Sequence, residues 1–99
     1  MDIKIHSIRF DADTKLLDFI DLKVKKLIQY FDDIIGAEVF LRLDKSQDLE
    51  NKVVEIRLTL PRNELFAKKQ SKTFEESTDL TVEALRKQII RHKEKLRRV

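Results

Sequence analysis

The sequence predicts an α+β domain with the element order β-α-β-β-β-α, a two-layer fold in which two helices cover one face of a four-stranded sheet. Two long segments repeat apolar residues every three or four positions, and the segments around them alternate apolar with polar residues. One Gly and one Pro leave little loop. With 99 residues, 41% of them hydrophobic, we expect a single domain over residues 1–99 with one core.

The N-terminal third is predicted to form a strand and then a long helix. Residues 2–10 alternate in polarity but change parity near Ser7, which indicates a strand with a kink or bulge. Asp13 or Thr14 can cap the helix, and Gly36 stands where a helix that continues through Ile34 would end. The apolar positions of this helix are Leu16, Ile20, Val24, Leu27, Phe31 and Ile34.

The middle of the chain is predicted to form three strands. Residues 38–44 and 54–60 each alternate strictly, and the polar stretch 45–52 between them indicates an antiparallel hairpin. Residues 61–63 (PRN) form a second turn. Residues 65–69 then form a short fourth strand, whose lysines favour the edge of the sheet.

The last segment is predicted to be an amphipathic helix. Thr73 can cap it, with Glu76 three residues later in a capping-box pattern. Its apolar seam contains Phe74, Thr78, Val82, Leu85, Ile89, His92 and Leu96. We expect His92, near the centre of this seam, to pack or to lie at its edge.

Positive charge gathers at the C-terminal end. Residues 86–99 hold seven of the 21 Lys and Arg and one acid, Glu94, so they are net +6 and residues 1–85 are net −3. Runs of charge are usually solvated faces, and cations near a helix C-terminus favour the helix dipole. Here the mutual repulsion of seven cations costs more stability than the helix dipole offsets, so neither a solvated face nor the dipole explains the segment well. Because neutralised phosphates release counterions, nucleic acid is the first partner to test.

Projection at 100° per residue sorts these charges into faces. Lys23 and Lys26 share one flank of the first helix with Tyr30. On the last helix, one basic ridge contains Lys87, Arg91, Lys95 and Arg98, and a second contains Arg86, Lys93 and Arg97. Basic ridges beside a concave strip suit a phosphate backbone. The sequence does not decide which ridge faces the first helix.

Enzymatic, metal and membrane functions find little support. Two His, no Cys and no clustered carboxylates disfavour a metal site. No Ser has a His and an acid suggested as partners, and one Gly leaves no phosphate-binding loop. We expect no catalytic residue, metal, cofactor or small-molecule substrate. Without a signal-peptide pattern or a membrane span, the chain is expected to be cytoplasmic and to bind no membrane.

Two motifs resemble a known family. The segment KLIQYFDDI at residues 26–34 resembles the KLxxYFDxI end of the first helix in bacterial ribosome hibernation-promoting factors, a family that includes ribosome-associated inhibitor A. The segment RHKEKL at residues 91–96 resembles the HKxKL-type motif that ends the second helix of that family. The resemblance covers essentially the whole chain.

This resemblance implies a fold like the double-stranded-RNA-binding domain. It also implies binding to small-subunit ribosomal RNA between head and body, where the domain would block the tRNA and mRNA path. Many relatives carry a Tyr near the place of Glu75, so an RNA contact there is not expected. The chain stops at Val99, as a short form would, and would then need another factor, or the ribosome's own surfaces, to make ribosome dimers.

The sequence therefore predicts a non-enzymatic, RNA-binding translational inhibitor of idle cells. Its expected partners are the small ribosomal subunit and ribosomal RNA, and the free protein is expected to be monomeric. The predicted RNA-binding residues are Lys23, Lys26, Lys87, Arg91, Lys93, Lys95 and Arg98, while Tyr30 and His92 either contact RNA or pack. Sequence-specific base readout is not expected, because the ridges offer few amide or aromatic side chains.

Two alternatives stay open. A generic double-stranded-RNA-binding module is disfavoured, because the last helix begins with Glu75 and Glu76 and is basic at its far end. A protein-interaction domain, such as one that modulates a transcription factor, would need an exposed apolar patch, and the clean amphipathicity leaves few apolar residues for one.

Overall fold

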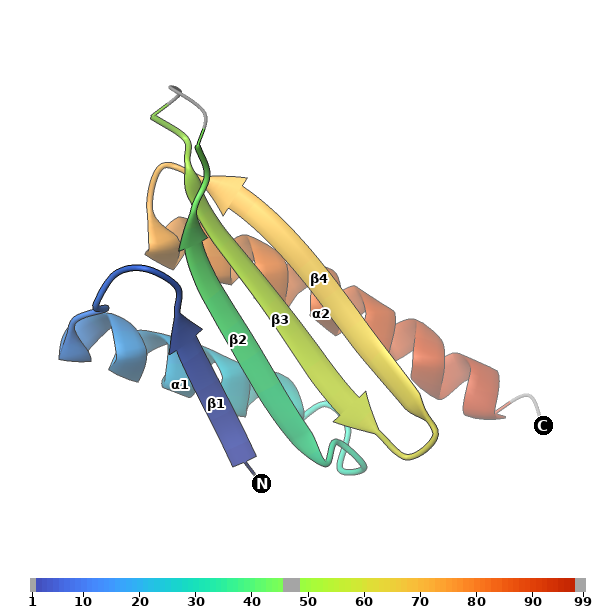
Figure 1. Cartoon of the computed structure of the whole chain (residues 1–99). Helices are drawn as coiled ribbons and strands as arrows, with labels where there is room; N and C mark the ends of the chain where they lie inside the picture. The colour runs from blue at the N-terminus through green and yellow to red at the C-terminus, as the bar shows by residue number, and fades with distance from the viewer. Residues whose placement is uncertain (1, 46–48, 98–99) are drawn as a thin grey trace.

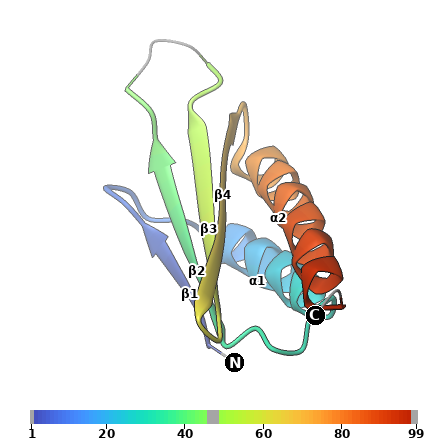
Figure 2. The same cartoon turned by 90° about the vertical axis from the view of Figure 1, so that its right-hand side faces the viewer.

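The predicted element order is confirmed by the computed structural model (Figure 1), which describes residues 2–45 and 49–97. The elements are β1 (Asp2–Ser7), α1 (Thr14–Ile28), β2 (Gly36–Leu43), β3 (Lys52–Leu60), β4 (Asn63–Ser71) and α2 (Phe74–Arg97). The strands lie in the order β1-β2-β3-β4, with β1 parallel to β2 and the other pairs antiparallel. Both helices cover the same face of the sheet (Figure 2).

The core lies between the helices and this sheet face. Because strand side chains alternate between faces, every second residue of the central strands points at the helices and is buried, as in the cross-strand set of Val39, Ile56 and Ala67. The helices contribute Leu16, Ile20, Val24, Leu27, Leu85 and Ile89. The fold is therefore two layers around one apolar interface, with β4 and α2 along one margin.

Helix α1 is shorter than the sequence predicts. It begins at the Asp13 cap, whose carboxylate accepts from Leu16 N–H at 2.8 Å, and it ends at Ile28 rather than continuing to Ile34. The backbone N–H groups of Tyr30 and Phe31 each bond to the carbonyl three residues earlier, which tightens the last turn. Continuing the helix would place the carboxylates of residues 32–33 at the negative end of its dipole. The chain instead forms a loop that carries Tyr30 and Phe31.

Gly36 belongs to β2 and is not a helix cap. Its φ is not positive. A Cβ at this position would lie 3.3 Å from the carbonyl oxygen of Asp2, on the neighbouring strand β1. The glycine therefore permits a close approach of two parallel strands, and the prediction of a left-handed helix end at Gly36 is wrong.

The other strand boundaries also differ from the predicted ones. Strand β1 has no bulge: it ends at Ser7, and Arg9 takes a left-handed φ of 65° that leads Phe10 to stack on Phe74 at 5.1 Å. The shift in the apolar–polar alternation near Ser7 marks the end of the strand, where the sequence had indicated a bulge. Strand β4 lies at the sheet edge as predicted but is longer, Asn63–Ser71, because the tight Pro61–Arg62 turn lets pairing begin at once.

Helix α2 is held to the sheet by buried hydroxyls. Its predicted cap is confirmed, since Glu76 N–H donates to Thr73 Oγ1 at 3.0 Å. Ser77 and Thr81 are fully buried, although the predicted apolar seam did not include them. Ser77 Oγ donates to the Lys52 carbonyl of β3 at 2.6 Å. Thr81 Oγ1 donates to the Ser77 carbonyl within α2 at 2.7 Å and also lies 3.3 Å from the Val54 carbonyl of β3. These bonds fix the N-terminal half of α2, from which its basic half extends.

Candidate nucleic-acid interface

Helix α2 changes sign along its length. Its acids Glu75, Glu76, Asp79 and Glu83 lie in the first half, and after Glu83 only Glu94 is acidic. The cations of the second half are Arg86, Lys87, Arg91, Lys93, Lys95 and Arg97. The packing of α2 between β4 and α1 divides these cations between two sides of the helix.

One side forms a groove with strand β4. Two adjoining hollows meet at Gln88 and Arg91 and run along α2 beside the edge strand. The cations that line them are Lys69 of β4 and Lys87, Arg91 and Lys95 of α2, and we call this surface the β4–α2 groove. Within the described residues none of these four cations forms an ion pair. Their charge is thus available to an external anion.

The acid in the β4–α2 groove is already engaged. Glu83 accepts from Arg86 Nε at 2.9 Å, and this hydrogen bond holds the pKa of the Glu83 carboxyl below its ordinary value, with a smaller effect from Lys87. The same bond raises the pKa of Arg86. Arg86 therefore neutralises the carboxylate, and the groove keeps its positive field.

The opposite side of α2 faces α1 and is partly self-neutralised. Lys23 of α1 lies 3.2 Å from the Asp79 carboxylate of α2, and its ammonium lies 5.4 Å from the centre of the Phe19 ring. Further along, Tyr30 and Lys93 line one hollow. The ridge that contains Arg86 and Lys93 is thus the one that faces Lys23, Lys26 and Tyr30, which the sequence left undecided.

Tyr30 and His92 lie in different environments. The Tyr30 side chain is 43% exposed. His92 packs edge-on against Phe31, with ring centres 5.4 Å apart, while it also borders the β4–α2 groove. His92 therefore has a packing role, and Tyr30 presents an open aromatic face.

The predicted RNA-binding residues do not form one strip. Lys87, Arg91 and Lys95 lie together in the β4–α2 groove, whereas Lys23, Lys26 and Lys93 lie on the α1 side. Arg98 lies outside the described residues.

Sequence reasoning missed two residues of the groove. Lys69 has the same strand parity as the buried Ala67 and Ser71 but is exposed, because it lies at the margin of the sheet. A lysine at a position that should face the helices could have indicated from the sequence that this part of the strand lies at the margin of the sheet. Gln88 donates from its amide to the Phe66 carbonyl at 2.9 Å and so covers part of the β4 edge. Nothing in the sequence indicated that contact.

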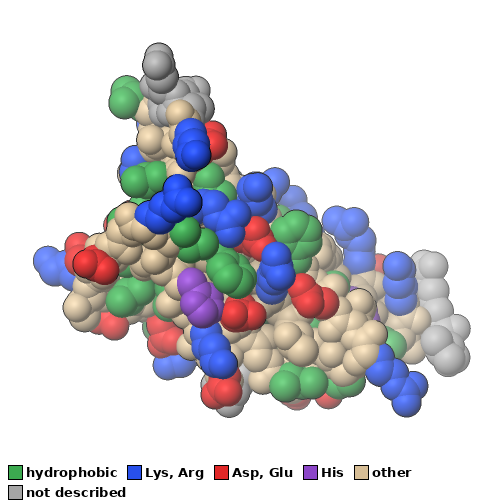
Figure 3. Space-filling view, in the orientation of Figure 1, with side chains coloured by type: hydrophobic (Ala, Val, Ile, Leu, Met, Phe, Trp, Pro, Cys, Tyr) green, Lys and Arg blue, Asp and Glu red, His purple; other side chains and the backbone are tan. Residues whose placement is uncertain are grey.

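The outer sheet face, turned away from the helices, has a mixed character (Figure 3). Arg57 donates to Glu55 at 2.7 Å and lies 5.3 Å from the centre of the Phe40 ring, which stacks on His6. Its cations Lys4, Arg42, Arg57 and Lys68 are interspersed with Asp2, Glu38, Glu55 and Glu64. Acids and bases balance on this face, so it offers a weaker field to phosphate than the β4–α2 groove.

Over residues 2–45 and 49–97, no three His, Cys, Asp or Glu side chains gather as metal ligands would. In the same part of the chain no helix has both the length and the apolar character needed to cross a membrane.

Comparison with known proteins gives a consistent result. Residues 3–97 match a family model described as "Sigma 54 modulation protein / S30EA ribosomal protein". The chain is 28% identical over 95 residues to a ribosome hibernation promoting factor of Azotobacter vinelandii, covering 96% of this chain and 85% of that protein. It is 29% identical to a ribosome hibernation promotion factor of Bacillus subtilis (strain 168), covering 99% of this chain and 51% of that protein. The chain thus spans about half of the second relative.

Solved structures match the fold. A ribosomal subunit interface protein from Coxiella burnetii superposes with a TM-score of 0.85 at 20% identity, over 95% of this chain and 99% of that one. The N-terminal domain of Thermus thermophilus Protein Y superposes with a TM-score of 0.78 at 22% identity, over 93% of this chain and 99% of that one. These structures have the same two-layer arrangement as the fold described above.

Proposed function

Because the chain belongs to the Sigma 54 modulation protein / S30EA ribosomal protein family, we propose that it binds small-subunit ribosomal RNA and silences idle ribosomes. As a member of this family of ribosome hibernation factors it is not an enzyme. The proposed binding place is the tRNA and mRNA path between head and body of the small subunit. There the folded domain inhibits translation by occupying space, acting in the cytoplasm as a monomer when free.

The observation that carries this proposal is the set of four cations in the β4–α2 groove that form no ion pair with any other described residue. Lys87, Arg91 and Lys95 recur every four residues, so they stand about 6 Å apart along one side of α2. Lys69 adds a cation from the opposite wall. A row of cations without carboxylate partners gains the counterion-release free energy of phosphate binding without first losing an ion pair.

Phosphate contacts would set the position of the protein on the RNA. Such contacts fix register and orientation and are insensitive to base identity. The groove lies between a helix and an edge strand that are joined by the Gln88–Phe66 bond and by the contact between the Ser77 and Ser71 hydroxyls. Its cations are therefore held on a stiff frame, which suits a steric inhibitor because little chain entropy is lost on binding.

The test is co-sedimentation with purified small ribosomal subunits across a salt series of about 50 to 200 mM. A Lys87/Arg91/Lys95→Glu variant should lose binding by at least about 100-fold, and mutation of the cations to Gln should lower the salt slope by about two to three. The matched control reverses the charges of Lys4, Lys45 and Lys68, which lie away from the groove and form no ion pair with another described residue. It makes the same change in net charge and should bind nearly normally.

Two results would contradict the proposal. If the wild-type protein stays in the supernatant at low salt, it does not bind the small subunit, and a protein partner becomes the better hypothesis. Equal losses in the groove variant and the control would show that only net charge matters. An in vitro translation assay on the same proteins connects binding to inhibition, since the groove variant should leave translation uninhibited.

A further inference from the structure

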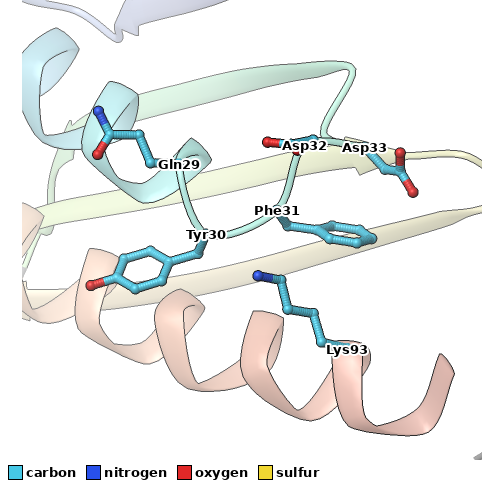
Figure 4. A pocket seen from close by; sticks show the side chains of 6 residues that line it. All are labelled: Gln29, Tyr30, Phe31, Asp32, Asp33 and Lys93. Atoms are coloured by element: carbon cyan, nitrogen blue, oxygen red, sulfur yellow. The ribbon is translucent and has the colours of Figure 1, made fainter. Parts of the chain in front are cut away.

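The loop after α1 carries a small hollow on the α1 side of α2. Gln29, Tyr30, Phe31, Asp32, Asp33 and Lys93 line it, and its volume is about 290 Å³. We call it the Tyr30 hollow (Figure 4). It exists because α1 ends at Ile28: a longer helix would have distributed these side chains around its circumference. A second hollow, lined by Lys26, Gln29 and Tyr30, adjoins it.

The side chains of the Tyr30 hollow have distinct orientations. Figure 4 shows the Lys93 ammonium directed at the loop between Tyr30 and Phe31, and the Asp32 carboxylate extended towards Gln29, while Asp33 points the other way. Within the described part of the chain neither Asp32 nor Lys93 forms an ion pair. The Lys93 ammonium lies 6.0 Å from the centre of the Phe31 ring. A carboxylate and an ammonium that form no ion pair with another described residue thus border one cavity together with the exposed Tyr30.

This combination does not suit a phosphate group, because a phosphate would meet the Asp32 carboxylate at close range. It does suit an unpaired base. Proteins recognise single-stranded RNA by stacking bases on aromatic rings and by hydrogen bonds to the base edges. Tyr30 can supply the stacking surface, while Asp32 and Lys93 supply two acceptors and a donor.

We propose that the Tyr30 hollow binds one unpaired guanine of the RNA held by this protein, an inference that rests on the proposed function. Guanine presents two adjacent donors, N1–H and N2–H₂, beside the acceptor O6. The Asp32 carboxylate would accept from both donors, and Lys93 would donate to O6. Adenine and cytosine each offer the carboxylate one exocyclic amine and place a ring acceptor beside it, and uracil offers a single donor. Guanine is therefore the base that satisfies both charged groups.

The surrounding charges support an RNA chain at this place. Lys26 borders the adjoining hollow, and Arg86 is close enough to Tyr30 for the tyrosine to raise its pKa, after the larger effects of Glu83. These cations can contact phosphates on either side of a base that is inserted beside Tyr30. The expectation of no sequence-specific readout, drawn from the ridges alone, did not include this loop.

The chain provides its own probe. Tyr30 is the one Tyr of the sequence, and there is no Trp, so intrinsic fluorescence excited near the tyrosine band reports on Tyr30. Short RNA oligonucleotides of adenines with a single central guanine should quench this fluorescence and bind about tenfold tighter than all-adenine oligonucleotides of equal length. Tyrosine ring resonances in NMR spectra give a second readout free of absorbance by the RNA.

Asp32→Asn should abolish the preference for guanine, while Asp33→Asn should keep it. Both variants change the net charge equally on neighbouring residues, so their difference isolates the orientation seen in Figure 4. Tyr30→Leu lacks this intrinsic probe, so its binding is followed by the fluorescence anisotropy of end-labelled oligonucleotides, and it should bind both oligonucleotides more weakly. Circular dichroism verifies that each variant is folded.

The outcomes separate this inference from the proposed function. If wild-type protein binds small subunits but quenches equally with both oligonucleotides, or if Asp33→Asn loses the preference as Asp32→Asn does, the guanine hollow is wrong and the groove proposal stands. If the guanine preference appears while wild-type protein fails to sediment with small subunits, the hollow is supported and the ribosomal assignment fails.

Discussion

The Lys23 ammonium of α1 lies 3.2 Å from the Asp79 carboxylate of α2, and this ion pair joins the two helices across the face that covers the sheet. The pair also engages Lys23, a residue that the family resemblance assigns to RNA binding. The basic surface is divided as a result. The β4–α2 groove holds cations without described partners, whereas the α1 side must release Lys23 before that residue can contact a phosphate.

Asp79→Asn should release Lys23 for RNA. Both side chains are more than a third exposed, so the pair contributes less than about 1 kcal/mol to the free energy of unfolding, measured by urea denaturation. We expect binding to small subunits to tighten by about two- to fivefold at low salt. Asp21→Asn, which breaks the Lys25–Asp21 pair within α1, removes the same charge. A gain of equal size in both variants would show that Lys23 has no particular role.

Glu83→Gln should strengthen binding, because it removes the acid that lines the β4–α2 groove and frees Arg86 on the α1 side of α2. The hydrogen bond from Arg86 lowers the pKa of Glu83, so the carboxylate is fully charged at neutral pH and its stabilising effect is lost only as pH falls through that lowered pKa. The substitution removes this charge and frees Arg86, and we expect a steeper salt dependence of co-sedimentation, by about one unit of slope.

The control for this prediction is Glu64→Gln on β4, which makes the same charge change at an exposed position of the outer sheet face. It should leave the slope unchanged. An unchanged slope in Glu83→Gln would show that Arg86 does not reach the RNA, and an equal steepening in the control would show that only net charge matters.

The sequence pattern was sufficient for the element order, because alternation along the strands and the seam of α2 both reflect burial against one interface. It failed at the end of α1. Phe31 and Ile34 keep helical spacing, yet both point at the core from a loop. Apolar periodicity records which residues are buried, and a loop that passes over the core satisfies it as well as a helix does.

The candidate site was predictable in composition but not in arrangement. The cations of α2 were identified from charge alone, since that excess is local to one segment. Their partition between two surfaces depends on which side of α2 meets β4. The buried Ser77 hydroxyl, which donates to β3 and lies 2.7 Å from the Ser71 hydroxyl of β4, contributes to this docking beside the apolar residues of the seam. Polar residues at buried positions are invisible to an apolar pattern, so the docking and the groove it creates required the structure.

Ser77→Ala should destabilise the protein by about 1 to 3 kcal/mol in urea denaturation, because Ser77 is fully buried and the Lys52 carbonyl on β3 would lose its donor. Ser71, whose hydroxyl lies 2.7 Å from that of Ser77, would lose a partner as well. Amide hydrogen exchange should rise first in the N-terminal half of α2. Thr59→Ala, at an exposed position of β3, should cost less than about 0.5 kcal/mol. Similar losses in the two variants would contradict the anchoring role of Ser77.

Gly36→Ala separates the two explanations of this glycine. At a left-handed helix end the substitution would cost about 1 kcal/mol or more through strain at Gly36 itself. In β2 the new Cβ meets the Asp2 carbonyl at 3.3 Å, so β1 must shift outwards by a few tenths of an ångström. The loss of chain entropy in the unfolded state offsets part of that cost. We therefore expect a net change below about 1 kcal/mol together with faster amide exchange confined to β1, and unchanged exchange in β4. Faster exchange at the end of α1, with β1 unaffected, would instead favour the capping role.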